Sequence, residues 1–231
     1  MTVNWGSLEP VIHHENQFQK ALKWAKAHQE MMAIVGIITL LLAIGIPWYL
    51  HSLQQSDKDA QNFFNMGQQY LRMPIDPKTG FKTETDRDQM VLQTFQRIVT
   101  DYPGTPTSKI ARYYVARTQY MLGQFDQAYS NFDVASSELQ KGPLGDEAYF
   151  GKILCREGQN QWPQASTLAE TFLKDHPDSF MVPQVRLSLA DIYAKNNNKD
   201  KAQEELKLIV KDYPDSNWSR EADRRLMEPN S

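Results

Sequence analysis

The stretch that decides the fold is "KLIVKDYPDS", residues 207–216, because the chain has already used the same phrase twice. "RIVTDYPGT" stands at residues 97–105 and "FLKDHPDS" at residues 172–179. Pro177 and Pro214 are 37 residues apart. A period between about 20 and 50 residues is the sequence signature of stacked supersecondary units. The phrase therefore predicts a repeat array.

The 37-residue period also governs small and apolar positions. Pro103 lies two periods before Pro177. The recurring sets are Ala128, Ala165 and Ala202; Phe95, Phe132, Ala169 and Leu206; Ile98, Ala135, Phe172 and Ile209; and Ala116, Ile153 and Ala190. Within one copy, Ala128, Phe132 and Ala135 have the i, i+4, i+7 spacing of one helix face. Each copy must therefore bury an apolar stripe on a helix.

A second apolar helix precedes this one, in "IARYYVARTQYML" at residues 110–122. "GQFD" at residues 123–126 makes the turn, because Gly123 adopts a left-handed backbone at little steric cost. Proline then ends the second helix, since it lacks an amide donor and clashes with the preceding turn. Asp178–Ser179 and Asp215–Ser216 follow the prolines as candidate caps of the next helix. Each copy is predicted to be a helical hairpin, and the fold class is all-α.

The pattern of turn aromatic, Ala, aromatic, Ala and Pro resembles the tetratricopeptide repeat, whose standard length is about 34 residues, over roughly residues 86–227. The matching residues are Gly123, Phe125, Ala128, Phe132, Ala135, Trp162, Ala165, Phe172, Pro177, Ala202, Ile209 and Pro214. The departures are three extra residues after each proline, Gln140 where a proline belongs, and Lys199 at a turn aromatic. The resemblance implies an α-solenoid of antiparallel helix pairs. Its P-x-S variant resembles repeat proteins of the bacterial cell envelope.

The resemblance also implies a concave surface, lined by the first helix of each pair, that binds a peptide or a partner helix. The family's groove positions fall on Tyr113, Arg117, Tyr120, Phe150, Leu154, Leu187 and Asp191. Tyr and Arg suit an interface because each combines a large contact area with a polar end. The competing interpretation is that Phe150 and Leu187, in register with Tyr113, only pack between helices.

"MMAIVGIITLLLAIGIPWYL", residues 31–50, contains no charged side chain. Twenty helical residues span about 30 Å, the thickness of a bilayer's hydrocarbon core. Trp48 and Tyr49 stand where interfacial aromatic residues belong. A buried core helix is disfavoured because the repeats supply the core. A cleaved signal peptide is disfavoured because a long polar segment precedes the apolar run and no small-residue cleavage site follows it. A single transmembrane helix is predicted.

Lys20, Lys23 and Lys26 precede the apolar run, whereas only Lys58 lies close behind it. This bias places the N-terminus in the cytoplasm and the repeats on the opposite side of the membrane. With the resemblance to envelope repeat proteins, it implies a bacterial inner membrane with the repeats in the periplasm. The predicted organisation is a cytoplasmic tail at 1–30, a transmembrane helix at 31–50, a stalk helix and loop forming a divergent first repeat at 51–85, and repeats with a C-terminal capping helix at 86–231.

Two further segments have a helical pattern. Residues 51–73 continue as a helix that pairs with residues 87–100, and the loop "PIDPKTGFKTETD" at 74–86 separates them. In the tail, Phe18, Leu22 and Ala25 share one face of a short interfacial helix. That helix is either a cytoplasmic docking tag or the flank of the anchor.

Composition and motifs argue against several other functions. A net charge of −3 and a pI near 6.0 leave no basic stripe for nucleic acid. Cys155, the single cysteine, lies on an apolar helix and is predicted to be core. His176 is at a helix end, and His13–His14 have no partners at metal-ligand spacing. Nucleotide-binding and hydrolase motifs are absent. We expect no catalysis, metal or cofactor.

Anchor and repeats together resemble the YfgM-type ancillary subunit of the bacterial protein-translocation channel. The resemblance implies a membrane-anchored scaffold that binds protein partners at the periplasmic face, chaperone-like or translocon-associated. Tethering would raise its effective concentration beside a membrane complex. The alternative is a fixed structural subunit of a larger envelope assembly. Constant stoichiometry would indicate the subunit, and variable capture of many chains would indicate the chaperone-like scaffold.

Overall fold

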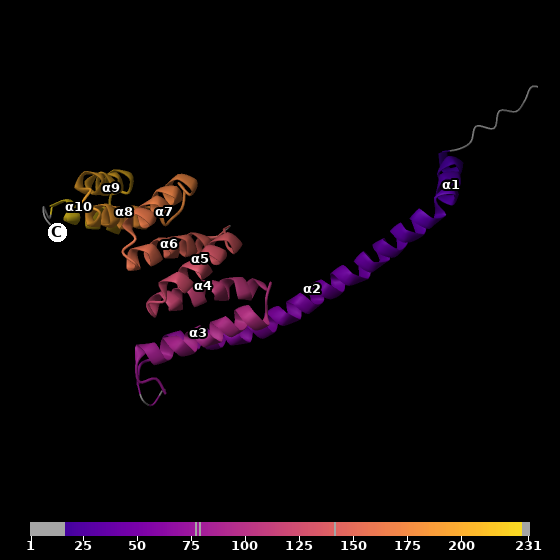
Figure 1. The fold of residues 1–231 in the computed structure, drawn as a ribbon, viewed down its shortest axis with the longest axis horizontal. Coiled ribbons are helices and arrows are strands. Elements are labelled where there is room, and N and C mark those ends of the chain that lie inside the picture. The colour runs from indigo at the N-terminus through magenta and orange to yellow at the C-terminus, as the bar shows by residue number, and fades with distance from the viewer. Residues whose placement is uncertain (1–16, 77, 79, 141, 228–231) are drawn as a thin grey trace, which may run out of the picture. The chain divides into compact units, whose positions relative to one another are not determined.

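The computed structural model describes residues 17–76, 78, 80–140 and 142–227, and these residues form helices and connecting loops without a strand (Figure 1). The all-α prediction is confirmed. The helices are α1 (Gln17–Ala27), α2 (Gln29–Arg72), α3 (Glu84–Asp101), α4 (Pro106–Met121), α5 (Phe125–Glu138), α6 (Pro143–Gly158), α7 (Trp162–Asp175), α8 (Val182–Lys195), α9 (Lys199–Asp212) and α10 (Asn217–Met227). Contacts divide the chain into two compact units, residues 1–52 and 53–231, and α2 contributes to both.

In the first unit, the described residues comprise α1 and the beginning of α2. Every residue from 31 to 50 is exposed. Among the described helices, α2 alone is long and apolar enough to cross a membrane, with a mean hydropathy of 2.3 over its most apolar stretch. Pro47 lies inside α2 without ending it. These are the length and composition that the sequence pattern predicted for a transmembrane helix.

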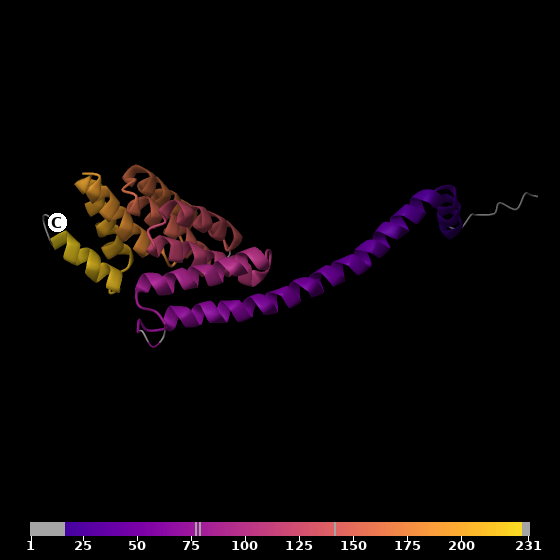
Figure 2. The ribbon, with the colours of Figure 1, turned by 60° about the horizontal axis from the view of Figure 1, so that its bottom comes forward.

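In the second unit, consecutive helices pack as antiparallel pairs (Figure 2). The pairs are α4 with α5, α6 with α7, and α8 with α9, and the end of α2 packs on α3. The 37-residue period is visible in the packing, because the equivalent residues are all buried: Ala128, Ala165 and Ala202; Phe132, Ala169 and Leu206; Ala135, Phe172 and Ile209. The core is therefore distributed along the array, as expected for a solenoid.

The turn inside each pair has a left-handed residue at the same place. Gly123 has φ +73°, Asn160 has φ +58° and Asn197 has φ +56°. These three residues are each one period apart. Glycine lacks the Cβ that makes this conformation costly, and asparagine tolerates it better than other residues with a side chain. The chain therefore reverses by the same geometry in all three hairpins.

The loop between α2 and α3 is shorter than the predicted interval of 74–86, because α3 begins at Glu84. The Thr83 hydroxyl accepts a hydrogen bond from the Asp86 amide at 3.0 Å, and the Asp86 carboxylate accepts one from the Thr83 amide at 3.1 Å. This capping box satisfies two amide donors that the first turn leaves open. Helix α3 therefore begins directly after Thr83.

The two serines after the prolines act differently. Ser216 Oγ accepts from the Ser219 amide at 3.0 Å and caps α10, as predicted. Ser179 Oγ accepts from the Met181 amide at 3.1 Å, but α8 begins only at Val182. Ser179 also donates to Asp146 Oδ2 of the preceding pair at 2.6 Å. It therefore holds two repeats together in addition to organising the turn.

Candidate partner-binding face

The first helices of successive pairs are joined directly by side chains. Tyr113 Oη on α4 donates a hydrogen bond to Glu147 Oε2 on α6 at 2.7 Å. Ser188 Oγ on α8 donates to Glu157 Oε1 on α6. Among the described residues, no side-chain hydrogen bond joins α5 to α7 or α7 to α9. The first helices α4, α6 and α8 are therefore fastened to one another by side chains, in addition to the packing within each pair.

We call this surface the first-helix face and define it by the seven residues predicted from the sequence. Three of them form a buried column in register: Tyr113 is 8% exposed, Phe150 7% and Leu187 7%. Each lies one period after the last. A partner cannot reach these side chains without moving a helix. Their role is therefore to pack between helices below the surface of the face. This is the packing arrangement that the competing interpretation describes for Phe150 and Leu187.

The other four predicted residues are accessible. Arg117 and Asp191 are exposed, and Tyr120 and Leu154 are half-buried. Arg117, Leu154 and Asp191 occupy one repeat position, each a period apart, on α4, α6 and α8 respectively. The face therefore presents a cation, an apolar side chain and an anion in sequence along the array.

Asp191 already has a partner within the protein. Arg225 Nη1 on α10 donates to Asp191 Oδ1 at 2.6 Å, and Arg225 Nε donates to Glu221 Oε1 at 2.7 Å. Hydrogen bonds from Arg224 and Arg225 hold the pKa of Glu221 at about 2. Burial lowers the pKa of Arg225, but its bonds to Glu221 and Asp191 outweigh this and raise it. Helix α10 thus packs against α8 and α9, and Arg225 pairs with the exposed Asp191 at the third repeat.

Glu157, on the first helix α6, is a further candidate residue that the sequence reasoning missed. It lies one period after Tyr120, so the same repeat position carries a tyrosine on α4 and a glutamate on α6. Burial raises the pKa of the Glu157 carboxyl, the Ser188 hydrogen bond lowers it, and the negative charge of Asp191 raises it again. Burial also raises the pKa of the Tyr120 hydroxyl, with a further contribution from Glu157. Applying the period to Tyr120 would have found Glu157.

Glu147 was missed for a different reason. It stands one period after Ile110, which the sequence reasoning did not include in the groove. Burial, with the acceptor Glu147, strongly raises the pKa of the Tyr113 hydroxyl, which therefore stays protonated and donates. The hydrogen bond between Tyr113 and Glu147 forms because α4 and α6 approach each other in the folded chain. The 37-residue period does not predict that contact.

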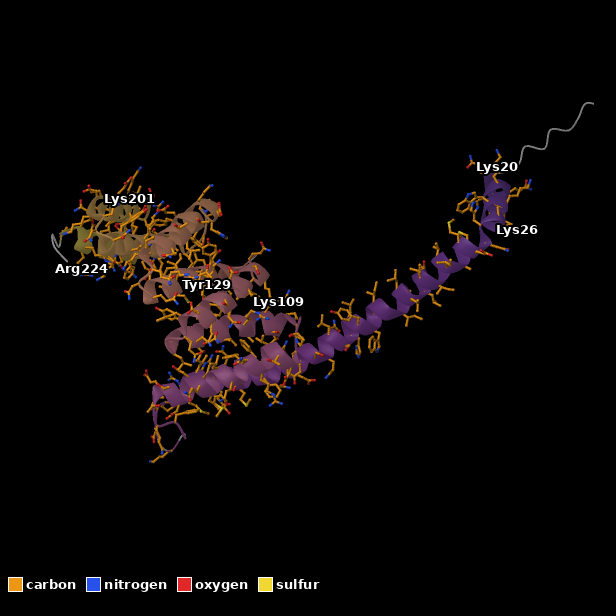
Figure 3. All side chains as sticks on the ribbon, in the orientation of Figure 1. Lys20, Lys26, Lys109, Tyr129, Lys201 and Arg224 are labelled. Carbon is orange, nitrogen blue, oxygen red and sulfur yellow. The ribbon has the colours of Figure 1, made fainter. Side chains whose placement is uncertain are left out.

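A second cluster of charged and aromatic side chains lies between α5 and α6, where Figure 3 labels Tyr129. Lys152 Nζ is 2.6 Å from Asp133 Oδ1 and 4.4 Å from the Tyr149 ring centre. The Arg156 guanidinium lies 3.9 Å from the Tyr129 ring centre. Because these cations already contact a carboxylate or an aromatic face, the cluster fastens two helices together.

The candidate catalytic groups do not converge. Cys155 is fully buried in the core, as predicted, and burial raises the pKa of its thiol to about 12. His176 instead places Nδ1 3.1 Å from Asp146 Oδ1 and stacks on Phe172. Among the described residues, no group of three or more His, Cys, Asp or Glu side chains is arranged to hold a metal ion. His13 and His14 lie outside the described residues.

Comparison with known proteins identifies the repeat in part of the chain. Residues 156–220, from the end of α6 to the start of α10, match the tetratricopeptide repeat family. A solved structure of a thermophilic tetratricopeptide repeat protein from Thermus thermophilus is similar, with 17% identity and a TM-score of 0.36, over 73% of this chain and 99% of that chain. No curated protein matches the chain.

The matched segment indicates a class. The described residues of the second unit form a solenoid of antiparallel helix pairs, and residues 156–220 within it match the tetratricopeptide repeat. Proteins of this class are scaffolds that bind other proteins on extended concave surfaces, and they generally do so without catalysing a reaction.

Proposed function

We propose that this protein is a membrane-anchored scaffold that binds protein partners through the first-helix face, on the periplasmic side of a bacterial inner membrane. The observation that carries the proposal is the accessible set Arg117, Tyr120 and Leu154 above a buried column of aromatic and apolar side chains. Arginine and tyrosine dominate the binding energy of many interfaces because they bury large areas and also hydrogen-bond. A partner with a mixed apolar and charged surface fits this face.

The face is pre-organised for binding. The Tyr113–Glu147 and Ser188–Glu157 hydrogen bonds fix α4, α6 and α8 against one another. A surface that is ordered before it meets its partner loses less conformational entropy on binding. The partner therefore selects a preformed shape, and a short helix or an extended peptide is the kind of ligand we expect.

The anchor is the second part of the proposal. Water would meet an uninterrupted apolar surface on residues 31–50, whereas a bilayer would bury it. The lysines before this segment favour the cytoplasmic side for the N-terminus. The division into a tail at 1–30, a span at 31–50, a stalk and loop at 51–85 and repeats at 86–231 belongs to this proposal. Tethering concentrates the face near membrane complexes, which suits a chaperone-like or translocon-associated role.

A fixed structural subunit is the second candidate function. The observation that favours it is that Asp191, Glu147 and Glu157 are already hydrogen-bonded within the protein. A surface with its polar groups already paired adapts poorly to many sequences and suits one constant partner. The two candidates differ in stoichiometry, because a subunit co-purifies in a constant ratio and resists salt.

The test is crosslinking in cells from a photoreactive amino acid in place of Arg117. The matched control is the same substitution at Lys207, an exposed residue on the second helix α9. We expect a defined protein adduct from position 117 and none from position 207. Equal adducts from both positions, or none from either, would contradict binding through the first-helix face. One adduct in constant yield favours the subunit, and many variable adducts favour the chaperone-like scaffold.

A further inference from the structure

Helix α1 has an apolar face without a protein partner among the described residues. Phe18 is 71% exposed and Leu22 is 45% exposed. At about 100° per residue, Phe18, Leu22 and Ala25 fall within a narrow sector of the helix surface. A stripe of this kind on a short surface helix requires an apolar environment to cover it.

The opposite face of α1 is basic. Lys20 and Lys23 lie on the side away from the apolar stripe, Lys26 lies beside the stripe, one helical turn after Leu22, and Gln17–Ala27 contains no acidic residue. Figure 3 labels Lys20 and Lys26 near the two ends of the helix. The helix therefore combines a positive charge along its length with an apolar stripe, which is the composition of interfacial membrane helices.

A change of direction separates α1 from α2. Helix α1 ends at Ala27 and α2 begins at Gln29, and Figures 1 and 2 show α1 at an angle to the start of α2. The Trp24 and His28 rings stack with centroids 4.7 Å apart, and His28 Nδ1 donates to the Trp24 carbonyl oxygen at 2.9 Å. Because the chain bends here, α1 does not continue along the axis of the apolar segment.

We propose that α1 lies along the headgroup layer of a membrane rich in anionic lipid, as a second membrane contact beside the transmembrane segment. The inference rests on the proposed anchoring of residues 31–50. If that segment spans the bilayer, α1 stands at headgroup level, because the apolar run begins only a few residues after it. Acyl chains then cover the apolar stripe, and lipid phosphates pair with the lysines.

The test uses the full chain in lipid nanodiscs, with an environment-sensitive fluorophore on a new cysteine at Leu22→Cys. The native Cys155 stays unlabelled because it is buried and its thiol has a pKa of about 12. The matched control is Gln19→Cys, on the lysine side of α1. In discs rich in phosphatidylglycerol, we expect lipid-borne quenchers to quench the label at 22 several-fold more than the label at 19. K20Q/K23Q/K26Q in the L22C chain should abolish this difference.

Equal quenching at positions 19 and 22 overturns the proposal, as does unchanged quenching when phosphatidylcholine replaces phosphatidylglycerol. A label at Leu40→Cys separates the two proposals. If position 40 is in the bilayer core while position 22 is in water, only the inference about α1 fails. If position 40 is also in water, the proposed anchoring fails. Protection of position 22 by added poly-glutamate, but not by lipid, would mean an acidic polypeptide partner and would also overturn the proposal.

Discussion

The Phe132 ring of α5 lies where a side chain on Gly151 of α6 would begin. A Cβ added to Gly151 would be 2.6 Å from Phe132 Cζ, well inside van der Waals contact. Phe95, one period before Phe132, meets Gly67 of α2 in the same manner, with 2.7 Å between the added Cβ and Phe95 Cζ. In both places an aromatic side chain can enter the space between two helices because the neighbouring helix carries a glycine.

Gly151→Ala is expected to destabilise the repeat unit. Alanine is the better helix former by about 1 kcal/mol, but forcing a methyl group into a packed core costs about 1–3 kcal/mol. The cost of overpacking should exceed the gain in helix propensity, because the Phe132 ring is buried and has no free space to move into. The measurement is the thermal midpoint of the full chain in detergent, followed by circular dichroism. Gly36→Ala is the matched control, since nothing lies near its added Cβ. Similar shifts in both variants would contradict the argument.

Asn160→Ala should lower the free energy of unfolding by about 1 kcal/mol, because a left-handed backbone strains a residue that has a Cβ. Asn160→Gly should be neutral or slightly stabilising at the same φ of +58°. Both variants keep the backbone hydrogen bond from the residue 160 amide to the Glu157 carbonyl. Denaturant midpoints of the two variants check this prediction. It is wrong if the glycine variant is the less stable one.

Glu157→Gln should change how stability depends on pH. Because burial raises the Glu157 pKa above its ordinary value of 4.5, the folded state binds this proton more readily than the unfolded state. The contribution of Glu157 to the free energy of unfolding therefore falls as the pH rises from the ordinary pKa through the raised one, and then levels off. A glutamine at this position can still accept the hydrogen bond from Ser188, but it does not titrate. Its contribution to the free energy of unfolding therefore does not fall with pH.

We therefore expect E157Q to gain stability relative to the natural chain as the pH rises through this window. Below pH 4.5 the relative gain should disappear. Denaturant midpoints across the pH range measure the difference. Glu204→Gln, on the exposed surface of α9, is the control and should show a flat difference. A flat profile for E157Q would show that burial does not govern the titration of Glu157.

Arg225→Gln should loosen α10 at the end of the array. The change removes the contacts to Asp191 and Glu221, which for partly exposed ion pairs are worth about 0–1 kcal/mol. Global stability should therefore change little, while amide hydrogen exchange in α10 should speed up. Arg97→Gln, which removes an exposed ion pair with Asp101 in α3, is the control. Unchanged exchange in α10 would mean that apolar packing alone holds the helix.

Deletion of residues 1–50 should release the chain from membranes and leave the repeats folded. The repeats belong to a compact unit that begins at Leu53, so their core loses none of its buried residues. Membrane fractionation and the helical circular dichroism signal of the shortened chain measure the two effects. If the shortened chain kept its location and partners, tethering by residues 31–50 would be unnecessary and the proposed function would be wrong.

Part of the candidate face could be predicted from the sequence. The period placed Arg117, Leu154 and Asp191 on equivalent positions of the successive first helices α4, α6 and α8. The period could not decide whether Tyr113, Phe150 and Leu187 are buried or accessible, because their burial depends on how closely α4, α6 and α8 approach one another. Nor could it show that Arg225 reaches Asp191, since α10 lies outside the repeats and its docking depends on packing against α8 and α9.

The sequence alone determined the helices, their pairing and the apolar segment. These depend on local rules: a 3.6-residue stripe, a proline that lacks an amide donor, and a stretch of uncharged residues long enough for a bilayer. Only the tertiary structure decided which side chains hydrogen-bond between successive first helices. Those hydrogen bonds depend on distances between side chains more than thirty positions apart, and such distances are set by packing rather than by periodicity.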